Sequence, residues 1–359
     1  MSFATATQLS PEPVVKVATA FMAAKHLFVA NEIGLFEKLG DGSSTLDDLA
    51  SSTGVPRRTL RIVADAMVSL GFVQRDGDRY ANAPVAAEYL SGRSPADMRA
   101  FLRFFNHISY PGWLKLEDAV RTGKGQSRHG LFSEQEQLIF CAGVEVLTAG
   151  PAQALAASYD FSQHRRVLDL GGGTGSFLIP VLRGHPHLEA TLFELRTVVP
   201  IAEKRLRSDS ATRAVGIVGG DFFADPIPDG HDAVIVANVV HLFSPERNRT
   251  LLERLRRQAP AGARLLLVDF WTDSSHTQPP LAALMAGEFL IIAGEGDVYS
   301  EEEVREWLEA TGWRFLERKP LAGPAGLIVA ETAPPTASDA RLLPIRRRAR
   351  TTLKGGKSC

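Results

Sequence analysis

Cysteine is scarce in this sequence. The 359 residues contain two, Cys141 and Cys359, which lie far apart along the chain. Two such cysteines supply neither a disulfide framework nor a cluster of metal ligands, and this usage is typical of proteins from a reducing compartment. We therefore expect a cytoplasmic protein without a metal site.

Long hydrophobic runs and a strong net charge are also missing. No apolar run reaches the roughly 18 residues needed to cross a bilayer, and residues 1–15 lack the pattern of a signal peptide. The formal net charge is −1, which favours neither nucleic acid nor a membrane as a partner. Residues 333–359 depart from this average with seven Lys and Arg against one acidic residue, which predicts a basic, disordered tail.

The first hundred residues predict a small helical domain. After a start over 1–14 that we expect to be disordered, apolar residues recur at helical spacing over 15–39. Two short helices follow, and Asp76-Gly77 then marks a β-hairpin. Helix, turn, helix and hairpin form a winged helix, which we assign to residues 15–105.

A winged helix can bind DNA, with Arg57, Arg58 and Arg61 as the side chains that would read the groove. Residues 1–90, however, carry eight Lys and Arg against ten Asp and Glu, and phosphate contacts dominate affinity for nucleic acid. The apolar helix around Phe21–Phe36 has more hydrophobic surface than the domain can cover. We therefore expect this domain to form a homodimer; the alternative is a transcriptional regulator that senses a metabolite.

The rest of the chain predicts an α/β domain behind a helical linker. Residues 106–160 read as helices that contribute to a substrate pocket. From residue 161 to 332, short β-type runs alternate with helical ones, which indicates a Rossmann-like, mostly parallel sheet with helices on both faces. The predicted parallel strands are Val167–Leu170, Ala190–Phe193, Ala214–Val218, Ala233–Ala237 and Arg264–Phe270.

A glycine-rich turn follows the first predicted strand. Gly171, Gly173 and Gly175 form a G-x-G-x-G pattern, in which the backbone can approach a ligand closely and the next helix offers free N–H groups. A dinucleotide fingerprint would need glycine where Ser176 stands. Asp169, two residues before the first glycine, suits a ligand that carries a cationic amino group.

Two more acidic positions follow the next strands. Glu194 ends the second strand, where its carboxylate can accept hydrogen bonds from both ribose hydroxyls. Gly220-Asp221-Phe222 ends the third strand. The Asp221 carboxylate can accept a hydrogen bond from an adenine amino group, and the Phe222 ring can pack against the adenine. Each acid alone could be a helix cap. Together they lie at the edge where open α/β sheets bind their ligands.

Asn238 and His241 follow the fourth strand. Imidazole readily takes and releases a proton near neutral pH, so His241 at this edge can serve as a general base. Asp269 ends the next strand and could orient the imidazole, as the acid of a catalytic triad does. A structural role for His241 and a strand-end cap for Asp269 are the alternatives.

The chain resembles the S-adenosylmethionine-dependent O-methyltransferase family of the plant caffeate and flavonoid enzymes and the bacterial polyketide-tailoring enzymes. The resemblance covers roughly residues 15–332. It rests on four motifs that occur in the family's order and spacing, namely Leu168–Gly175, Glu194, Gly220–Phe222 and His241–Ser244. The resemblance implies a dimerisation domain, a Rossmann-like methyltransferase domain and methyl transfer from S-adenosylmethionine to a small, largely apolar acceptor. It assigns cofactor binding to Asp169, Gly171, Gly173, Glu194, Gly220, Asp221, Phe222 and Asn238.

The resemblance also assigns the catalytic residues. The family's base falls on His241, and its first supporting acid falls on Asp269, where a glutamate is usual. The second supporting glutamate would fall near Val298, so its role is absent or moved to Asp297 or Glu295. Some relatives methylate carbon, and a few have lost methyl transfer.

The reaction needs alignment and removal of a proton rather than a metal, and no metal-ligand spacing is visible near His241. We expect the acceptor to rest between helices that bear aromatic residues and methionine. Phe140, Met285 and Phe289 are the candidates for this contact.

Overall fold

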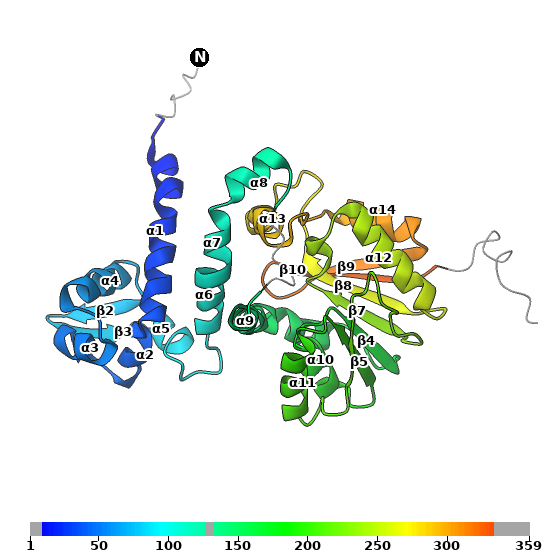
Figure 1. The fold of residues 1–359 in the computed structure, drawn as a ribbon, viewed down its shortest axis with the longest axis horizontal. Coiled ribbons are helices and arrows are strands. Elements are labelled where there is room, and N and C mark those ends of the chain that lie inside the picture. Colours follow the sequence, from blue (N-terminus) through cyan, green and yellow to red (C-terminus); the bar gives the residue numbers. More distant parts are fainter. Residues whose placement is uncertain (1–8, 126–131, 334–359) are drawn as a thin grey trace, which may run out of the picture.

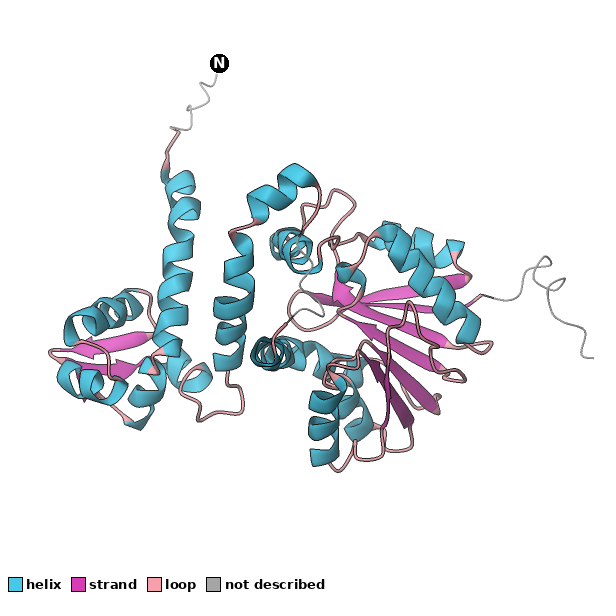
Figure 2. Cartoon of the chain, in the orientation of Figure 1, coloured by secondary structure: helices cyan, strands magenta, loops and turns pink. Residues whose placement is uncertain are grey.

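The protein consists of an N-terminal helical domain, a C-terminal α/β domain and a layer of helices between them (Figures 1 and 2). The structure is a computed structural model and describes residues 9–125 and 132–333. The basic tail predicted over 333–359 lies outside the described residues from 334 onward, as do residues 1–8.

The N-terminal domain has the predicted winged-helix arrangement. Its three-stranded sheet has the order β1-β3-β2. The elements are α1 (Glu12–Glu32), α2 (Leu35–Lys38), a 3-10 turn (Leu39–Asp41), β1 (Ser44–Thr45), α3 (Leu46–Thr53), α4 (Arg57–Ser69), β2 (Val73–Asp76), β3 (Arg79–Asn82) and α5 (Pro84–Tyr89).

Two local details of this domain differ from the sequence prediction. Helix α1 begins at Glu12, so the disordered start predicted over 1–14 extends too far, because the prediction waited for the first apolar residues. In the hairpin, Asp76 pairs with Arg79. The two-residue turn is therefore Gly77-Asp78, where Gly77 takes the positive φ of +58° that such a turn requires.

A layer of helices joins the two domains. It consists of α6 (Arg99–Phe104), a π-helical turn η2 (Phe105–Ser109), α7 (Tyr110–Trp113), α8 (Leu116–Thr122) and α9 (Glu134–Ser158). The first three form one continuous helical run (Figure 1). The domain boundary predicted between residues 105 and 106 falls inside this run.

The C-terminal domain is a seven-stranded sheet in the order β6-β5-β4-β7-β8-β10-β9. The strands are β4 (Arg166–Leu170), β5 (Glu189–Glu194), β6 (Gly216–Gly219), β7 (Ala233–Ala237), β8 (Arg264–Phe270), β9 (Trp313–Pro320) and β10 (Ala325–Thr332). Strands β4 to β8 pair in parallel, and β10 pairs antiparallel with β8 and β9.

Helices cover both faces of this sheet (Figure 1). They are α10 (Leu178–Gly184), α11 (Val199–Ser208), α12 (Pro245–Gln258) and α14 (Glu301–Ala310). Helix α13 (Pro280–Ala293) contacts α7, α8 and the 3-10 turn η3 (Val240–Leu242), which follows β7. Successive residues of β4 belong to different cores: Val167 packs in one hydrophobic cluster and Leu168 in the other. A strand that is buried on both faces explains the continuous apolar run in the sequence.

Helix α1 leaves apolar side chains uncovered. Val17 is 77% exposed and Phe21 is 52% exposed. Helices α1 and α9 are also long and apolar enough to cross a membrane by length and composition. Core helices of soluble proteins pass the same test, so the absence of a membrane partner stays a prediction.

Candidate active site at the carboxyl edge of the sheet

The glycine turn after β4 disfavours side chains through its backbone conformation or through close neighbours. Gly171 and Gly173 have φ values of +66° and +59°, in the left-handed region that glycine adopts without strain. A side chain at Gly172 would collide with the carboxylate of Asp169. The turn therefore closes over this carboxylate.

The carboxylate of Asp169 is buried without a partner. The residue is 0% exposed, and neither oxygen has a hydrogen-bond partner among the residues that the structure describes. Burial, with the neighbouring Glu194 as a second cause, raises the pKa of Asp169 to about 8. A buried polar group without a partner is costly, so the position suits a ligand that brings a cationic amino group.

Glu194, at the end of β5, faces the same turn. One carboxylate oxygen accepts the Gly173 N–H at 2.7 Å, and the other accepts the Leu195 N–H at 2.6 Å. Burial raises the pKa of Glu194, while these two hydrogen bonds lower it. Each carboxylate oxygen can accept a further hydrogen bond, which leaves capacity for the hydroxyls of a ribose.

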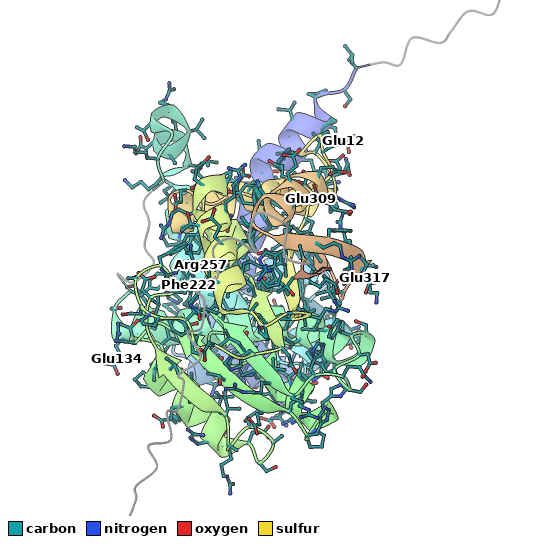
Figure 3. The ribbon with its side chains drawn as sticks, turned by 90° about the vertical axis from the view of Figure 1, so that its right-hand side faces the viewer. Glu12, Glu134, Phe222, Arg257, Glu309 and Glu317 are labelled. Carbon is teal, nitrogen blue, oxygen red and sulfur yellow. The ribbon has the colours of Figure 1, made fainter. Side chains whose placement is uncertain are left out.

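The segment after β6 brings an acid and an aromatic ring to this edge. The Asp221 side chain is exposed and accepts the Phe223 N–H at 2.8 Å. The ring of Phe222 lies 3.5 Å from the position a Cβ would take at Gly171, so it borders the glycine turn. In Figure 3, Phe222 lies near mid-height, well below Glu12 at the start of α1.

Asn238 follows β7 in an unusual backbone conformation. Its φ is +56°, which asparagine tolerates better than most residues, and its N–H donates to the Val268 carbonyl at 2.8 Å. Strained backbone of this kind clusters at functional sites. The turn leads directly into η3, which carries His241.

His241 and Asp269 form a buried pair. The Nδ1 atom of His241 lies 2.5 Å from one Asp269 oxygen, and the His241 backbone N–H donates to the other oxygen at 3.3 Å. Asp269 also accepts the Phe270 N–H at 2.8 Å. The sequence predicted an acid that orients the imidazole, and the structure brings the two side chains together in that way.

Aromatic rings hold the imidazole in place. The Phe289 ring, from α13, stacks on it with centroids 3.6 Å apart and planes 15° apart. Phe289 packs in one cluster with Phe270 and Met285, so one of the three candidate acceptor contacts lies on His241 and a second lies in the same cluster. The third, Phe140, packs instead with Phe104 in the neighbouring cluster of the helical layer.

The position of the family's second glutamate is apolar here. Val298 is 1% exposed and packs in the cluster of Phe289. Glu295 pairs with Arg247 at 2.8 Å, and the Asp297 backbone N–H donates to the His241 carbonyl at 3.1 Å. Among the described residues, the carboxylate that contacts the imidazole of His241 is that of Asp269.

Comparison with known proteins identifies this arrangement. Residues 113–314 match the family model of the O-methyltransferase domain, and residues 15–92 match that of the O-methyltransferase dimerisation domain. The chain belongs to the S-adenosylmethionine-dependent O-methyltransferase family. The cofactor of this O-methyltransferase is therefore S-adenosylmethionine, and the buried, unpaired Asp169 carboxylate fits its amino group.

Relatives of this O-methyltransferase match nearly its whole length. The tetracenomycin polyketide synthesis 8-O-methyl transferase TcmO of Streptomyces glaucescens is 29% identical and covers 89% of this chain and 96% of its own. The 3-hydroxy-5-methyl-1-naphthoate 3-O-methyltransferase of Streptomyces sahachiroi is 32% identical, with 88% and 92% covered. A crystal structure of human N-acetylserotonin methyltransferase in complex with SAM is 25% identical, covers 92% and 100%, and superposes with a TM-score of 0.83.

Three charged residues of this enzyme were not predicted from its sequence. Arg205 of α11 donates to the Thr174 hydroxyl at 2.6 Å and lies 3.1 Å from Glu145 of α9, so it ties the glycine turn to the helical layer. Glu288 of α13 is 3% exposed. A signal for Glu288 was present, because it is the one charged residue in an otherwise apolar helix.

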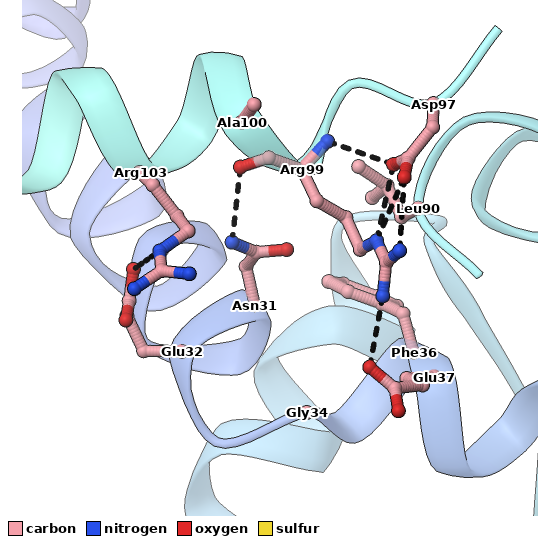
Figure 4. Close-up of a pocket in the computed structure, with 10 residues that line it drawn as sticks. All are labelled: Asn31, Glu32, Gly34, Phe36, Glu37, Leu90, Asp97, Arg99, Ala100 and Arg103. Carbon is pink, nitrogen blue, oxygen red and sulfur yellow. Dashed lines mark hydrogen bonds and ion pairs between the residues drawn. The ribbon is translucent and has the colours of Figure 1, made fainter. Parts of the chain in front are cut away.

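A cavity of the N-terminal domain lies elsewhere. Its volume is about 420 Å³, and Arg99 crosses it to reach Asp97 at 2.9 Å and Glu37 at 2.8 Å (Figure 4). Its lining residues all fall between 31 and 103. The cavity therefore lies apart from the acids and the glycine turn at the carboxyl ends of β4, β5 and β6.

Proposed function

We propose that this O-methyltransferase transfers the methyl group to a hydroxyl of a small, largely apolar aromatic acceptor, with His241 as the general base. The observation that carries the proposal is the 2.5 Å contact between His241 and Asp269, buried beside the stacked ring of Phe289. The names of two relatives, which methylate a naphthoate and act in tetracenomycin polyketide synthesis, support an aromatic acceptor.

The cofactor is assigned to the residues at the carboxyl edge. Asp169 would bind the cationic amino group, Glu194 the ribose hydroxyls, and Asp221 the adenine amino group, with Phe222 against the ring. The backbone at Gly171, Gly173, Gly220 and Asn238 would shape the cradle. When bound, S-adenosylmethionine supplies a methyl group on a positively charged sulfur.

His241 handles the proton of the acceptor. An Nδ1–H that donates to Asp269 leaves the lone pair on Nε2, which can take the proton of a hydroxyl. Asp269 then stabilises the imidazolium that forms, and does not itself need to be protonated. The stacked Phe289 ring fixes the plane of the imidazole, which aligns the acceptor for an in-line displacement.

The N-terminal domain is proposed to form a homodimer in the cytoplasm, without nucleic acid or membrane partners. The match of residues 15–92 to a dimerisation domain supports this assembly. The exposed apolar side chains of α1, which include Val17 and Phe21, are the surface we assign to it.

The proposal is tested with labelled S-adenosylmethionine and a panel of hydroxylated naphthoates, with 1-naphthoate as the acceptor that lacks a hydroxyl. We expect labelled methyl ethers from members of the panel and none from 1-naphthoate. Nuclear magnetic resonance of the product distinguishes a methyl ether from a C-methyl group. A C-methyl product, or no transfer to any hydroxylated aromatic compound in the panel or in a host extract, contradicts the proposal.

A further inference from the structure

Glu288 is a buried acid that the proposed mechanism does not use. It lies in α13, whose other thirteen residues are uncharged and mostly apolar, and it is 3% exposed. Burying a carboxylate is costly unless hydrogen bonds compensate for the lost water. The position of Glu288 therefore needs a reason.

The two oxygens of Glu288 differ in their surroundings. Oε2 accepts the Ser109 hydroxyl at 2.7 Å and the Trp113 indole N–H at 2.5 Å. Oε1 is buried and has no hydrogen-bond partner in the described part of the chain. The hydrogen bonds to Oε2 are enough to connect α13 to the helical layer. They do not explain why Oε1 is buried without a partner.

The surroundings of Glu288 lead to the proposed acceptor site. Residues three or four apart share a helix face, so Glu288 shares one with Met285 and Ile292. Met285 packs in the cluster of Phe289, whose ring lies on His241, and Ile292 packs with Phe104 and Ile108. Figure 1 shows α13 between the linker helices and the sheet, and it contacts both α7 and η3.

We propose that Oε1 of Glu288 accepts a hydrogen bond from a second polar donor of the acceptor, a hydroxyl or N–H remote from the one that is methylated. Ser109 and Trp113 hold Oε2, so the carboxylate keeps a fixed orientation with Oε1 free for the ligand. The acceptor is then an aromatic compound with two hydrogen-bond donors. This inference rests on the proposed function.

The test compares 2-naphthol with the isomeric dihydroxynaphthalenes. Binding to the full-length enzyme with S-adenosylhomocysteine is measured by calorimetry, and methyl transfer is measured separately. We expect at least one dihydroxynaphthalene to bind about tenfold or more tightly than 2-naphthol, because a site with a buried polar group rejects an analogue that leaves it unpaired. In Glu288→Leu no hydrogen-bonding group faces the second hydroxyl of the ligand, so this preference should disappear.

Ser109→Ala is the matched control. It removes one hydrogen bond from Oε2 and leaves Oε1 in place, so it should retain most of the preference. Equal binding of all the naphthols to the wild type, no binding of any, or a preference that survives Glu288→Leu would overturn the inference. If methyl transfer occurs but no dihydroxynaphthalene is preferred, the proposed function stands and the inference about Glu288 fails. If a dihydroxynaphthalene is preferred but no methyl transfer occurs, the binding subsite stands and the proposed function fails.

Discussion

The cofactor side and the acceptor side of the site are built in different ways. On the cofactor side, Asp169 and Glu194 sit in or at the end of adjacent parallel strands, so the sheet alone places them near each other. On the acceptor side, Phe289 comes from α13 and Ser109 from the helical layer, and packing between distant segments brings them together. The arrangement of the proposed cofactor residues follows from the sheet topology, whereas that of the proposed acceptor residues follows from tertiary contacts.

This difference predicts that substitutions on one side leave the function of the other intact. Changes at His241, Asp269 or Glu288 should affect transfer or the acceptor. Changes at Asp169 should affect cofactor binding. The experiment on His241 measures both quantities, so that it can contradict this division as well as support it.

The largest effect is expected at His241. In His241→Ala the rate of methyl transfer should fall by about 10²–10⁴, the usual contribution of a positioned general base. Affinity for S-adenosylhomocysteine should stay unchanged, because the imidazole contacts Asp269 and Phe289 and not the glycine turn. Single-turnover kinetics and calorimetry check the two quantities. A fall in affinity that matches the fall in rate would mean that the two sides are coupled.

A smaller loss is expected at Asp269. In Asp269→Asn the amide NH₂ must face at least one of three N–H donors, those of the imidazole, the His241 backbone and the Phe270 backbone. We expect the rate to fall by about 10–10³ because the imidazole loses its preferred tautomer, and the melting temperature to fall as well. Asp273→Asn, in the exposed loop after β8, is the control for a general effect of charge.

Asp169 should control cofactor affinity and its pH dependence. The pKa of about 8 means that the free enzyme holds a proton on Asp169 below that pH. A cationic ligand favours the ionised carboxylate, so binding releases this proton and affinity should rise with pH up to about 8, then level off. Asp169→Asn should weaken binding by about 1–3 kcal/mol and flatten this dependence. Calorimetry in buffers of different ionisation enthalpy counts the protons, and no proton release at pH 7 would contradict the assignment.

The smallest effect on the chemistry is expected from the surface of α1. Phe21→Glu places a charge on an exposed apolar position and should convert a homodimer into a monomer in light scattering. Val120→Glu, at an exposed apolar position of α8, should leave the dimer intact. A wild-type protein that is monomeric at micromolar concentration would contradict the proposed homodimer.

The strands and the turn that carry the proposed cofactor residues could be predicted from the sequence. A strand, a glycine turn and an acid each leave a local pattern, and β7 and β8 have the bounds that their apolar runs predicted. The burial of Asp169 without a partner could not be predicted, because it depends on Gly172 closing over it. The exposure of Asp221 likewise has no local signal.

The acceptor side could be predicted only in part. Phe289, Met285 and Phe140 were proposed by residue type, and the structure places the first two in one cluster and Phe140 in another. The contacts of Glu288 join residues 175 or more positions apart, and no local pattern specifies such a pairing. The valine at position 298 indicated only that the family's second supporting acid is absent or moved in this chain.

The pH dependence of His241→Ala tests the central claim most directly. With a phenolic acceptor from the panel, the residual rate of the variant should rise about tenfold per pH unit toward the pKa of the phenol, near 10, because solvent then supplies the phenolate. The wild type should respond far less over the same range. A residual rate that does not rise with pH, while cofactor affinity is intact, would contradict the role of His241 as the base.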